Sequence, residues 1–132
     1  MTKELLWLTY TVILTGILWV PYILDRAMVR GLMGAMANPS PSLPPQTAWA
    51  QRLQAAHANT VENLVVFAPL VLILNLLHVS TANTVLACVL FFWARLAYAI
   101  IYTLGIPVLR TLAFVAGFIA QVMLALAILG AM

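Results

Sequence analysis

The amino-acid sequence predicts an all-α membrane protein, a bundle of four transmembrane helices. Of its 132 residues, 65% are apolar and only 7% are charged, and the mean hydropathy is +1.09. Soluble domains carry roughly 25% charged residues, so lipid is expected to be the main solvent of this chain. A helix needs about 20 apolar residues to cross the hydrocarbon core, and four crossings with short connections use almost the whole length. We therefore expect a single membrane domain over residues 1–132.

The first helix is expected over about residues 5–36. Its apolar part covers residues 5–24, and a more polar helical stretch follows. Charged residues separate this apolar run from the small residues at 35–37, which does not fit a cleaved signal peptide, so the helix is expected to be retained. The next segment, 38–46, contains four prolines. Because proline cannot continue a helix, this segment is expected to be an extended connector.

The other three helices have chemically marked ends. Thr47 is a suitable N-cap for the second helix, and Pro69 removes one of its backbone hydrogen bonds and is expected to kink it. Gly105 and Pro107 fit the end of the third helix and the start of the fourth, which predicts an antiparallel hairpin. These three helices are expected over residues 47–77, 82–104 and 107–130.

Basic residues predict the orientation in the membrane. Arg26, Arg30 and Arg52 flank the first connection and Arg110 lies at the third, whereas the N-terminus has only Lys3. By the positive-inside rule, the first and third connections are expected in the cytoplasm, with both termini on the other side. A bacterial inner membrane is the expected location.

A polar stripe lies in the first half of the second helix. At about 100° per residue, Arg52, Asn59 and Asn63 share a narrow sector, Glu62 lies at its edge, and His57 points away. The helix would be roughly 46 Å long, which exceeds the ~30 Å hydrocarbon core, so its first turns should stand in the cytoplasmic interface. The stripe would then lie close to one membrane surface, and His57 is expected to have another role.

The third helix carries a buried cation. Arg95, Tyr98 and Tyr102 share one face within about 60°. An arginine among apolar neighbours in a membrane helix cannot face lipid cheaply, so Arg95 is expected to turn inward. We expect it to pair with Glu62, and such a pair is as compatible with a purely structural role as with a functional one.

Arg110 is expected in the first turn of the fourth helix. There the helix dipole and the unpaired N–H groups already favour negative charge, so an added arginine makes an anion-binding site. The alternative is a snorkelling arginine that anchors the topology. Several polar side chains are thus expected near one membrane surface, where they would suit a small zwitterionic ligand with excess negative charge. These cations, amide, carboxylate and phenols belong to Arg30, Arg52, Asn59, Glu62, Tyr98, Tyr102 and Arg110.

Other chemistries are not indicated. His57 and His78 lie far apart without clustered ligands, so no metal site is expected. Neither a catalytic triad nor a phosphate-binding glycine loop is visible, and no nucleic-acid partner is expected. Cys88 is the sole cysteine and lies in an apolar run, where we interpret it as a packing residue.

Four short motifs, in this order, resemble the MAPEG family (membrane-associated proteins in eicosanoid and glutathione metabolism). They are Arg30 with Ala37-Asn38-Pro39, Ala56-His57-Ala58-Asn59 with Glu62-Asn63, Arg95 with Tyr98 and Tyr102, and Arg110-Thr111. The resemblance implies a four-helix subunit that assembles as a homotrimer. It further implies that glutathione binds between neighbouring subunits near the cytoplasmic side. Members of the family conjugate glutathione to lipophilic electrophiles, reduce lipid hydroperoxides or isomerise lipid endoperoxides.

The resemblance also implies roles for individual residues. Arg110 matches the arginine proposed to stabilise the glutathione thiolate in the family. The chain departs from the prostaglandin E synthase pattern at Ala55, Ala58 and Phe114. Arg52 joins the predicted site by its place on the polar stripe. Positions matching glutathione contacts in eicosanoid-metabolising relatives are Arg30, Asn59, Glu62, Tyr98, Tyr102 and Arg110.

The expected function is that of a glutathione-dependent transferase or peroxidase acting on lipophilic electrophiles or lipid hydroperoxides. One alternative is a small four-helix transporter in which Glu62 binds and releases protons or cations. The arginines near this glutamate outnumber the acids and would repel a cation. The other alternative is a MAPEG-like membrane protein without catalytic activity.

Overall fold

The computed structural model describes residues 1–130 and contains, within them, five helices and no strand: α1 (Lys3–Ile17), α2 (Trp19–Met36), α3 (Ala48–Leu76), α4 (Ala82–Leu104) and α5 (Pro107–Gly130). Because α1 and α2 follow one another as a single 34-residue apolar segment, four segments are long and apolar enough to cross a membrane. The predicted all-α bundle with four membrane spans is therefore confirmed.

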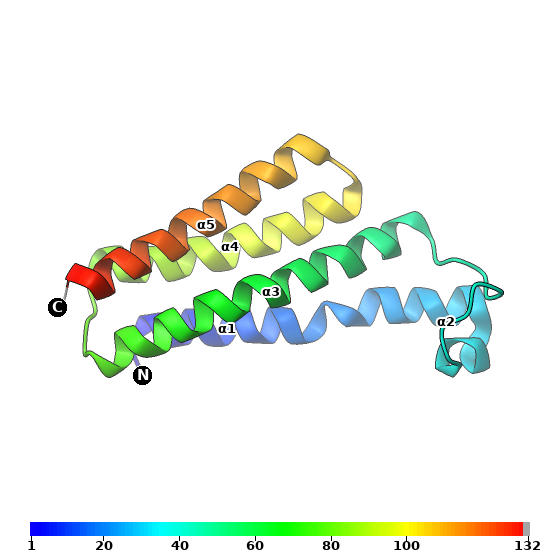
Figure 1. Cartoon of the computed structure of the whole chain (residues 1–132), viewed down its shortest axis with the longest axis horizontal. Helices are drawn as coiled ribbons and strands as arrows, with labels where there is room; N and C mark the ends of the chain where they lie inside the picture. The colour runs from blue at the N-terminus through cyan, green and yellow to red at the C-terminus, as the bar shows by residue number, and fades with distance from the viewer. Residues whose placement is uncertain (131–132) are drawn as a thin grey trace.

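The connections gather at two ends of the bundle (Figure 1). The proline-rich connector between α2 and α3 lies toward one end, with the α4–α5 turn on the same side; we call this the connector end. The start of α1, the end of α5 and the α3–α4 turn lie at the opposite end, which we call the terminal end. The first and third connections therefore lie toward the same end of the bundle.

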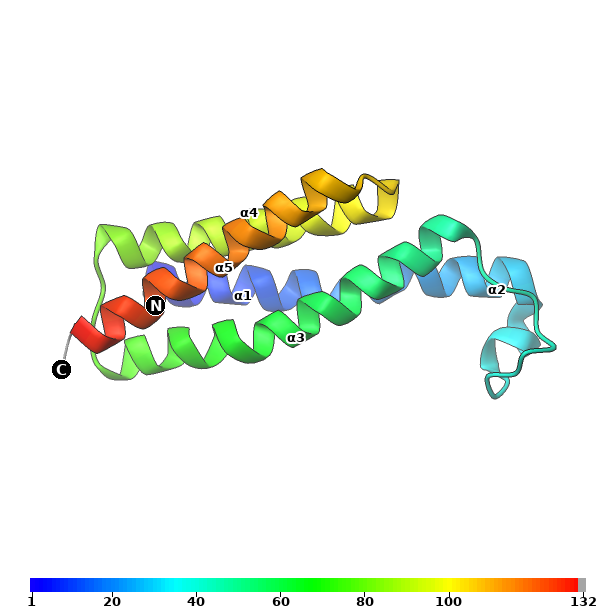
Figure 2. The same cartoon turned by 45° about the horizontal axis from the view of Figure 1, so that its top comes forward.

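The first membrane segment is broken in two places. Leu18 separates α1 from α2, three residues before Pro21. A proline cannot donate to the carbonyl four residues earlier and its ring clashes with it, which explains an interruption here. Gly31 has φ 73° and ψ 166°, a conformation that glycine alone adopts readily, and the last turn of α2 bends aside after it (Figure 2).

Side-chain and backbone caps define the other helix ends. Thr47 occupies the N-cap position of α3, but its hydroxyl donates to the carboxylate of Asp25 and accepts no hydrogen bond from the N–H groups of the helix. Thr81 begins α4 in a reciprocal capping box with the residue three positions later. Gly105, at φ 80°, ends α4 in the left-handed conformation, and Pro107 is the first residue of α5.

A packed apolar core lies toward the terminal end. The rings of Phe67 and Phe91 stack there with centroids 3.8 Å apart, and Cys88 is buried as a free thiol among apolar neighbours. Figures 1 and 2 both show α5 lying along α4. The core consists of Leu8, Phe67, Val71, Leu74, Ala87, Cys88, Phe91, Ala120 and Leu124.

Candidate functional site

Arg95 is the most buried charged group between α3 and α4. Its side chain is only 1% exposed, and Nη2 donates to Asn59 Oδ1 at 2.7 Å and to Thr60 Oγ1 at 2.9 Å. The guanidinium carbon lies 4.4 Å from the centre of the Tyr98 ring. The prediction that Arg95 turns inward is confirmed. Its Nε and Nη1 atoms are buried without a hydrogen-bond partner among residues 1–130.

The expected pair between Arg95 and Glu62 is wrong: it does not form within residues 1–130. Glu62 is exposed on α3, and the partners of Arg95 within residues 1–130 are Asn59 and Thr60. Two residues along a helix correspond to about 200° of rotation, so a glutamate two positions after the inward-facing Thr60 points to the outside. Neutral oxygen atoms of α3 therefore solvate this cation.

The polar stripe of α3 faces α4 and α5. Arg52 Nε donates to the carbonyl oxygen of Thr103 at 2.9 Å. Further along, Asn63 Nδ2 donates to the carbonyl oxygen of Asn59 at 2.9 Å, and Gln121 Nε2 donates to the carbonyl oxygen of Asn63 at 3.2 Å. The helical spacing thus correctly grouped these residues on one face of α3.

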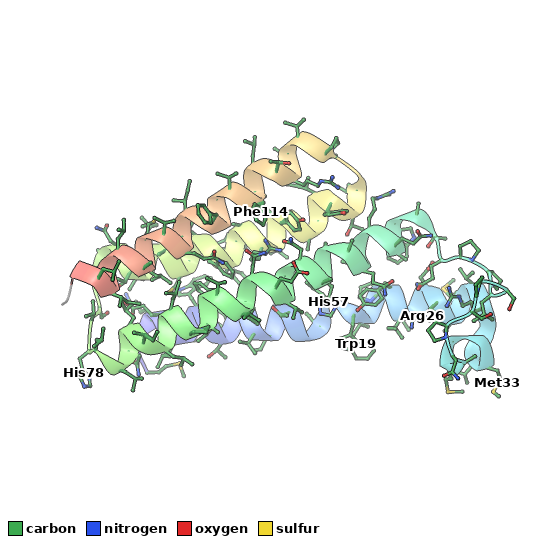
Figure 3. The ribbon with its side chains drawn as sticks, viewed as in Figure 1. Trp19, Arg26, Met33, His57, His78 and Phe114 are labelled. Carbon is green, nitrogen blue, oxygen red and sulfur yellow. The ribbon has the colours of Figure 1, made fainter. Side chains whose placement is uncertain are left out.

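Two tyrosines and an arginine extend this face toward the connector end. The Tyr98 and Tyr102 rings meet edge to face with centroids 5.6 Å apart. The guanidinium carbon of the half-buried Arg110, in the first turn of α5, lies 4.2 Å from the centre of the Tyr102 ring. Phe114, labelled on α5 in Figure 3, has its ring centroid 6.3 Å from that of Tyr98.

A close approach between α3 and the α4–α5 turn brings Arg52 to the same place. A Cβ atom at Gly105 would lie 3.4 Å from Cζ of Arg52, closer than most such contacts, so the missing side chain leaves room for the guanidinium. Contacts that pass through Arg95 and the backbone of Thr103 connect five of the seven predicted site residues, which we call the cationic strip: Arg52, Asn59, Tyr98, Tyr102 and Arg110.

Of the other two predicted site residues, Arg30 lies apart from the strip, whereas Glu62 is exposed on α3 within electrostatic range of Tyr98. Arg30 Nε donates to the carbonyl oxygen of Pro44 at 2.8 Å and so holds the proline-rich connector. Arg26, labelled in Figure 3, also holds the connector, because its Nε donates to Gln46 Oε1 at 3.1 Å. Glu62 lies on the exposed side of α3.

His57 has a role away from the strip, as its angular position predicted. Its Nδ1 lies 2.8 Å from the Tyr22 hydroxyl and its Nε2 lies 2.9 Å from the carbonyl oxygen of Thr15. Because a carbonyl only accepts, Nε2 carries the proton and Nδ1 accepts from the phenol. Figure 3 shows His57 on the side of α3 that faces the first membrane segment, where it ties α3 to the break between α1 and α2.

Sequence reasoning missed two polar residues that support the strip. Thr60 is fully buried and accepts from Arg95, and Gln121 is 7% exposed and donates to α3. A glutamine inside an otherwise apolar membrane helix needs a hydrogen-bond partner, so Gln121 carried a usable signal. Within residues 1–130 no three His, Cys, Asp or Glu side chains lie close enough together to hold a metal ion.

The class of protein defined by this architecture is a membrane protein of four spans with a cationic and phenolic strip between three of its helices. The family model of the MAPEG family matches residues 5–130, and the chain belongs to this family. It is therefore an integral multi-pass membrane protein of the glutathione and eicosanoid metabolism type. No curated protein and no solved structure matches the chain.

Proposed function

We propose that this protein is a glutathione-dependent transferase or peroxidase that acts on lipophilic electrophiles or lipid hydroperoxides. The observation that carries the proposal is the convergence of Arg52, Asn59, Tyr98, Tyr102 and Arg110 on the cationic strip. Membership of the MAPEG family supports the choice of glutathione over other small anions.

The strip matches the charges of glutathione. The tripeptide carries two carboxylates, one ammonium and a thiol, so at neutral pH it has a net negative charge. The guanidinium groups of Arg52 and Arg110 suit its carboxylates and its thiolate, since arginine donates in a planar fork. The exposed carboxylate of Glu62 is free to meet the ammonium. This charge pattern favours a ligand with net negative charge over the cation that the transporter alternative requires.

Arg110 is the residue assigned to the chemistry. A free cysteine thiol has a pKa of about 8.5, and a neighbouring guanidinium in a dry site lowers it, so more thiolate exists at neutral pH. The thiolate sulfur then forms a bond to the electrophilic carbon while the leaving group departs with its electron pair. With a hydroperoxide the sulfur attacks the terminal oxygen, and the O–O bond breaks to give a sulfenic acid and the lipid alkoxide, which takes up a proton to become the alcohol. A second glutathione then converts the sulfenic acid to a disulfide and water.

The active form is proposed to be a homotrimer that binds glutathione between subunits, with the first and third connections in the cytoplasm of a bacterial cell. Glu62 is exposed and Arg110 is only half-buried, so the packing within one chain does not shield their charges. Polar groups of this kind between membrane helices promote association. A site shared between subunits would also bring Arg30 and Glu62 of one subunit toward the strip of another.

The direct test is the thermal stability of the purified protein in mild detergent with reduced glutathione. A ligand at about 100 times its dissociation constant stabilises the native state by roughly 2.7 kcal/mol, which gives a measurable rise in Tm. Arg52→Gln should lose most of this rise. Arg26→Gln, which changes an arginine at the same end but outside the strip, should keep it. No rise at millimolar glutathione in the unaltered protein would contradict the proposal, and binding without turnover would establish the non-catalytic alternative.

A further inference from the structure

A buried carboxylate lies at the terminal end, far from the cationic strip along the bundle. Glu4, in the first turn of α1, is only 2% exposed. Its Oε1 accepts from Ser80 Oγ at 2.9 Å and from Thr84 Oγ1 at 2.6 Å. Its Oε2 is buried without a hydrogen-bond partner among residues 1–130. An unpaired buried carboxylate oxygen is costly, so the Glu4 carboxylate lacks one of the hydrogen bonds that would balance its burial.

This carboxylate lines a cavity of about 180 Å³, far larger than the roughly 15 Å³ that one water molecule requires. His78, labelled at this end in Figure 3, has φ 55°, a conformation uncommon outside glycine, and this turn of the backbone forms one wall. The lining residues are Thr2, Glu4, Leu74, Asn75, His78, Val79 and Ser80.

The chemistry of this lining favours an ammonium group over a metal ion. Glu4 is its one carboxylate, and the other polar side chains are hydroxyls, an amide and an imidazole. Calcium takes six to eight oxygen ligands, usually with several carboxylates, and the described residues hold no metal-binding group of acidic, His and Cys side chains. A primary ammonium needs only one carboxylate and neutral acceptors for its three N–H donors.

Two further hollows adjoin this cavity. The first, of about 570 Å³, shares Ser80 with it and is lined by Lys3 and by Thr81 and Ala82 at the start of α4. An ammonium side chain beside a helix N-terminus favours a phosphate. The second, of about 510 Å³, shares Val79 with the cavity and Thr81 with the first hollow. It runs between α4 and α5 over apolar residues that include Met123, Leu126 and Ala127.

We propose that the terminal end binds a phospholipid whose headgroup carries a primary ammonium. The ammonium pairs with the carboxylate of Glu4 from the cavity that this residue lines, the phosphate lies beside Lys3 at the start of α4, and an acyl chain follows the groove between α4 and α5. The order of the three hollows, anionic, cationic and apolar, matches the order of charges and chain in such a lipid. Their position at the end of the membrane-spanning helices places them at the level of the headgroups.

Native mass spectrometry of the full-length protein tests this proposal. It compares how strongly the protein retains phosphatidylethanolamine, phosphatidylcholine and phosphatidylglycerol with identical acyl chains. The choline headgroup keeps the positive charge but has no N–H donor, so the unaltered protein should retain ethanolamine lipid about tenfold better. Glu4→Gln should abolish that preference. Glu62→Gln, the same change on the exposed side of α3, should leave it intact. Lys3→Gln should weaken all three lipids alike, and unchanged affinities would overturn the phosphate assignment.

A second variant keeps the test decisive if Glu4→Gln does not fold. Ser80 lies in the exposed α3–α4 turn and lines the cavity, so Ser80→Leu should fill the cavity and remove the preference. The variant loses the hydrogen bond from Ser80 to Glu4 but keeps the carboxylate and its hydrogen bond from Thr84. Equal retention of ethanolamine and choline lipids by the unaltered protein would overturn the proposal. A preference that persists in the Glu4 or the Ser80 variant would overturn it as well.

Discussion

The hydrogen bonds of Arg95 predict which substitutions disturb the bundle. Arg95 donates to Asn59 at 2.7 Å and to Thr60 at 2.9 Å, whereas Glu62 is exposed. A hydrogen bond to a charged group contributes about 1.5–3 kcal/mol, but removing the arginine also removes the cost of burying its charge. We therefore expect Arg95→Met to lower the free energy of unfolding by about 2–3 kcal/mol. Glu62→Gln should change it by no more than about 0.5 kcal/mol.

A double-mutant cycle locates the interaction. Arg95→Met, Asn59→Ala and the double variant should give a coupling energy of about 1–2 kcal/mol, because the single substitutions remove the same hydrogen bond. The matched cycle of Arg95→Met with Glu62→Gln should give a coupling energy near zero. The free energy of unfolding is measured in mild detergent by titration with sodium dodecyl sulfate, followed by the loss of helical circular dichroism.

The result that would refute this reasoning is a large coupling between Arg95 and Glu62. An ion pair across the two helices would make Glu62→Gln cost about 3–5 kcal/mol, because it would leave a buried arginine without its partner. A destabilisation of that size in the Glu62 variant, together with a negligible coupling between Arg95 and Asn59, would restore the ion pair that the sequence alone predicted.

Four further outcomes are expected. Arg110→Leu should lower the rate of conjugation or peroxide reduction and shift the pH profile of that rate to higher pH, whereas Arg110→Lys should recover only part of the lost rate. A Leu variant that folds, binds glutathione and keeps its full rate and pH profile would show that Arg110 is only a topology anchor. His57→Phe should lower the free energy of unfolding by about 1–2 kcal/mol through its two lost hydrogen bonds and leave the glutathione-induced rise in Tm unchanged. Native mass measurement should find a trimer in mild detergent, and a monomer alone would contradict it. In a background without Cys88, a cysteine at position 42 should resist labelling from outside intact cells and one at the C-terminus should react; the opposite pattern would reverse the topology.

Much of the fold could be predicted from the sequence because the bilayer leaves few solutions. A spanning helix must satisfy all of its backbone groups internally and must be about 20 apolar residues long, so the four apolar runs locate the spans. Gly105 ends α4 because glycine readily adopts the left-handed conformation, and Pro107 begins α5 because its fixed φ suits the first turn of a helix. The angular spacing of Arg52, Asn59 and Asn63 placed them on one face of α3, and the contacts to α4 and α5 agree.

The partners of the buried charges could not be predicted in this way. Charge alone favoured Glu62 for Arg95, but a partner depends on which side chain of α3 faces α4, and a rotation of 200° separates Glu62 from Thr60. Arg30 has the right charge for an anion site, yet the path of the connector brings its donor to Pro44.

What the sequence by itself determined is the class of solvent, the number and length of the spans, and the faces on which polar residues lie, since all of these depend on neighbours within one helix. Only the tertiary structure decided that Asn59 and Thr60 solvate Arg95, that His57 ties α3 to the broken first segment, and that Glu4 is buried with one oxygen unpaired. Each of these facts depends on the rotation and height of one helix against another. Those are set by side-chain packing between segments up to 80 positions apart, as Glu4 and Thr84 are, and no local pattern encodes them.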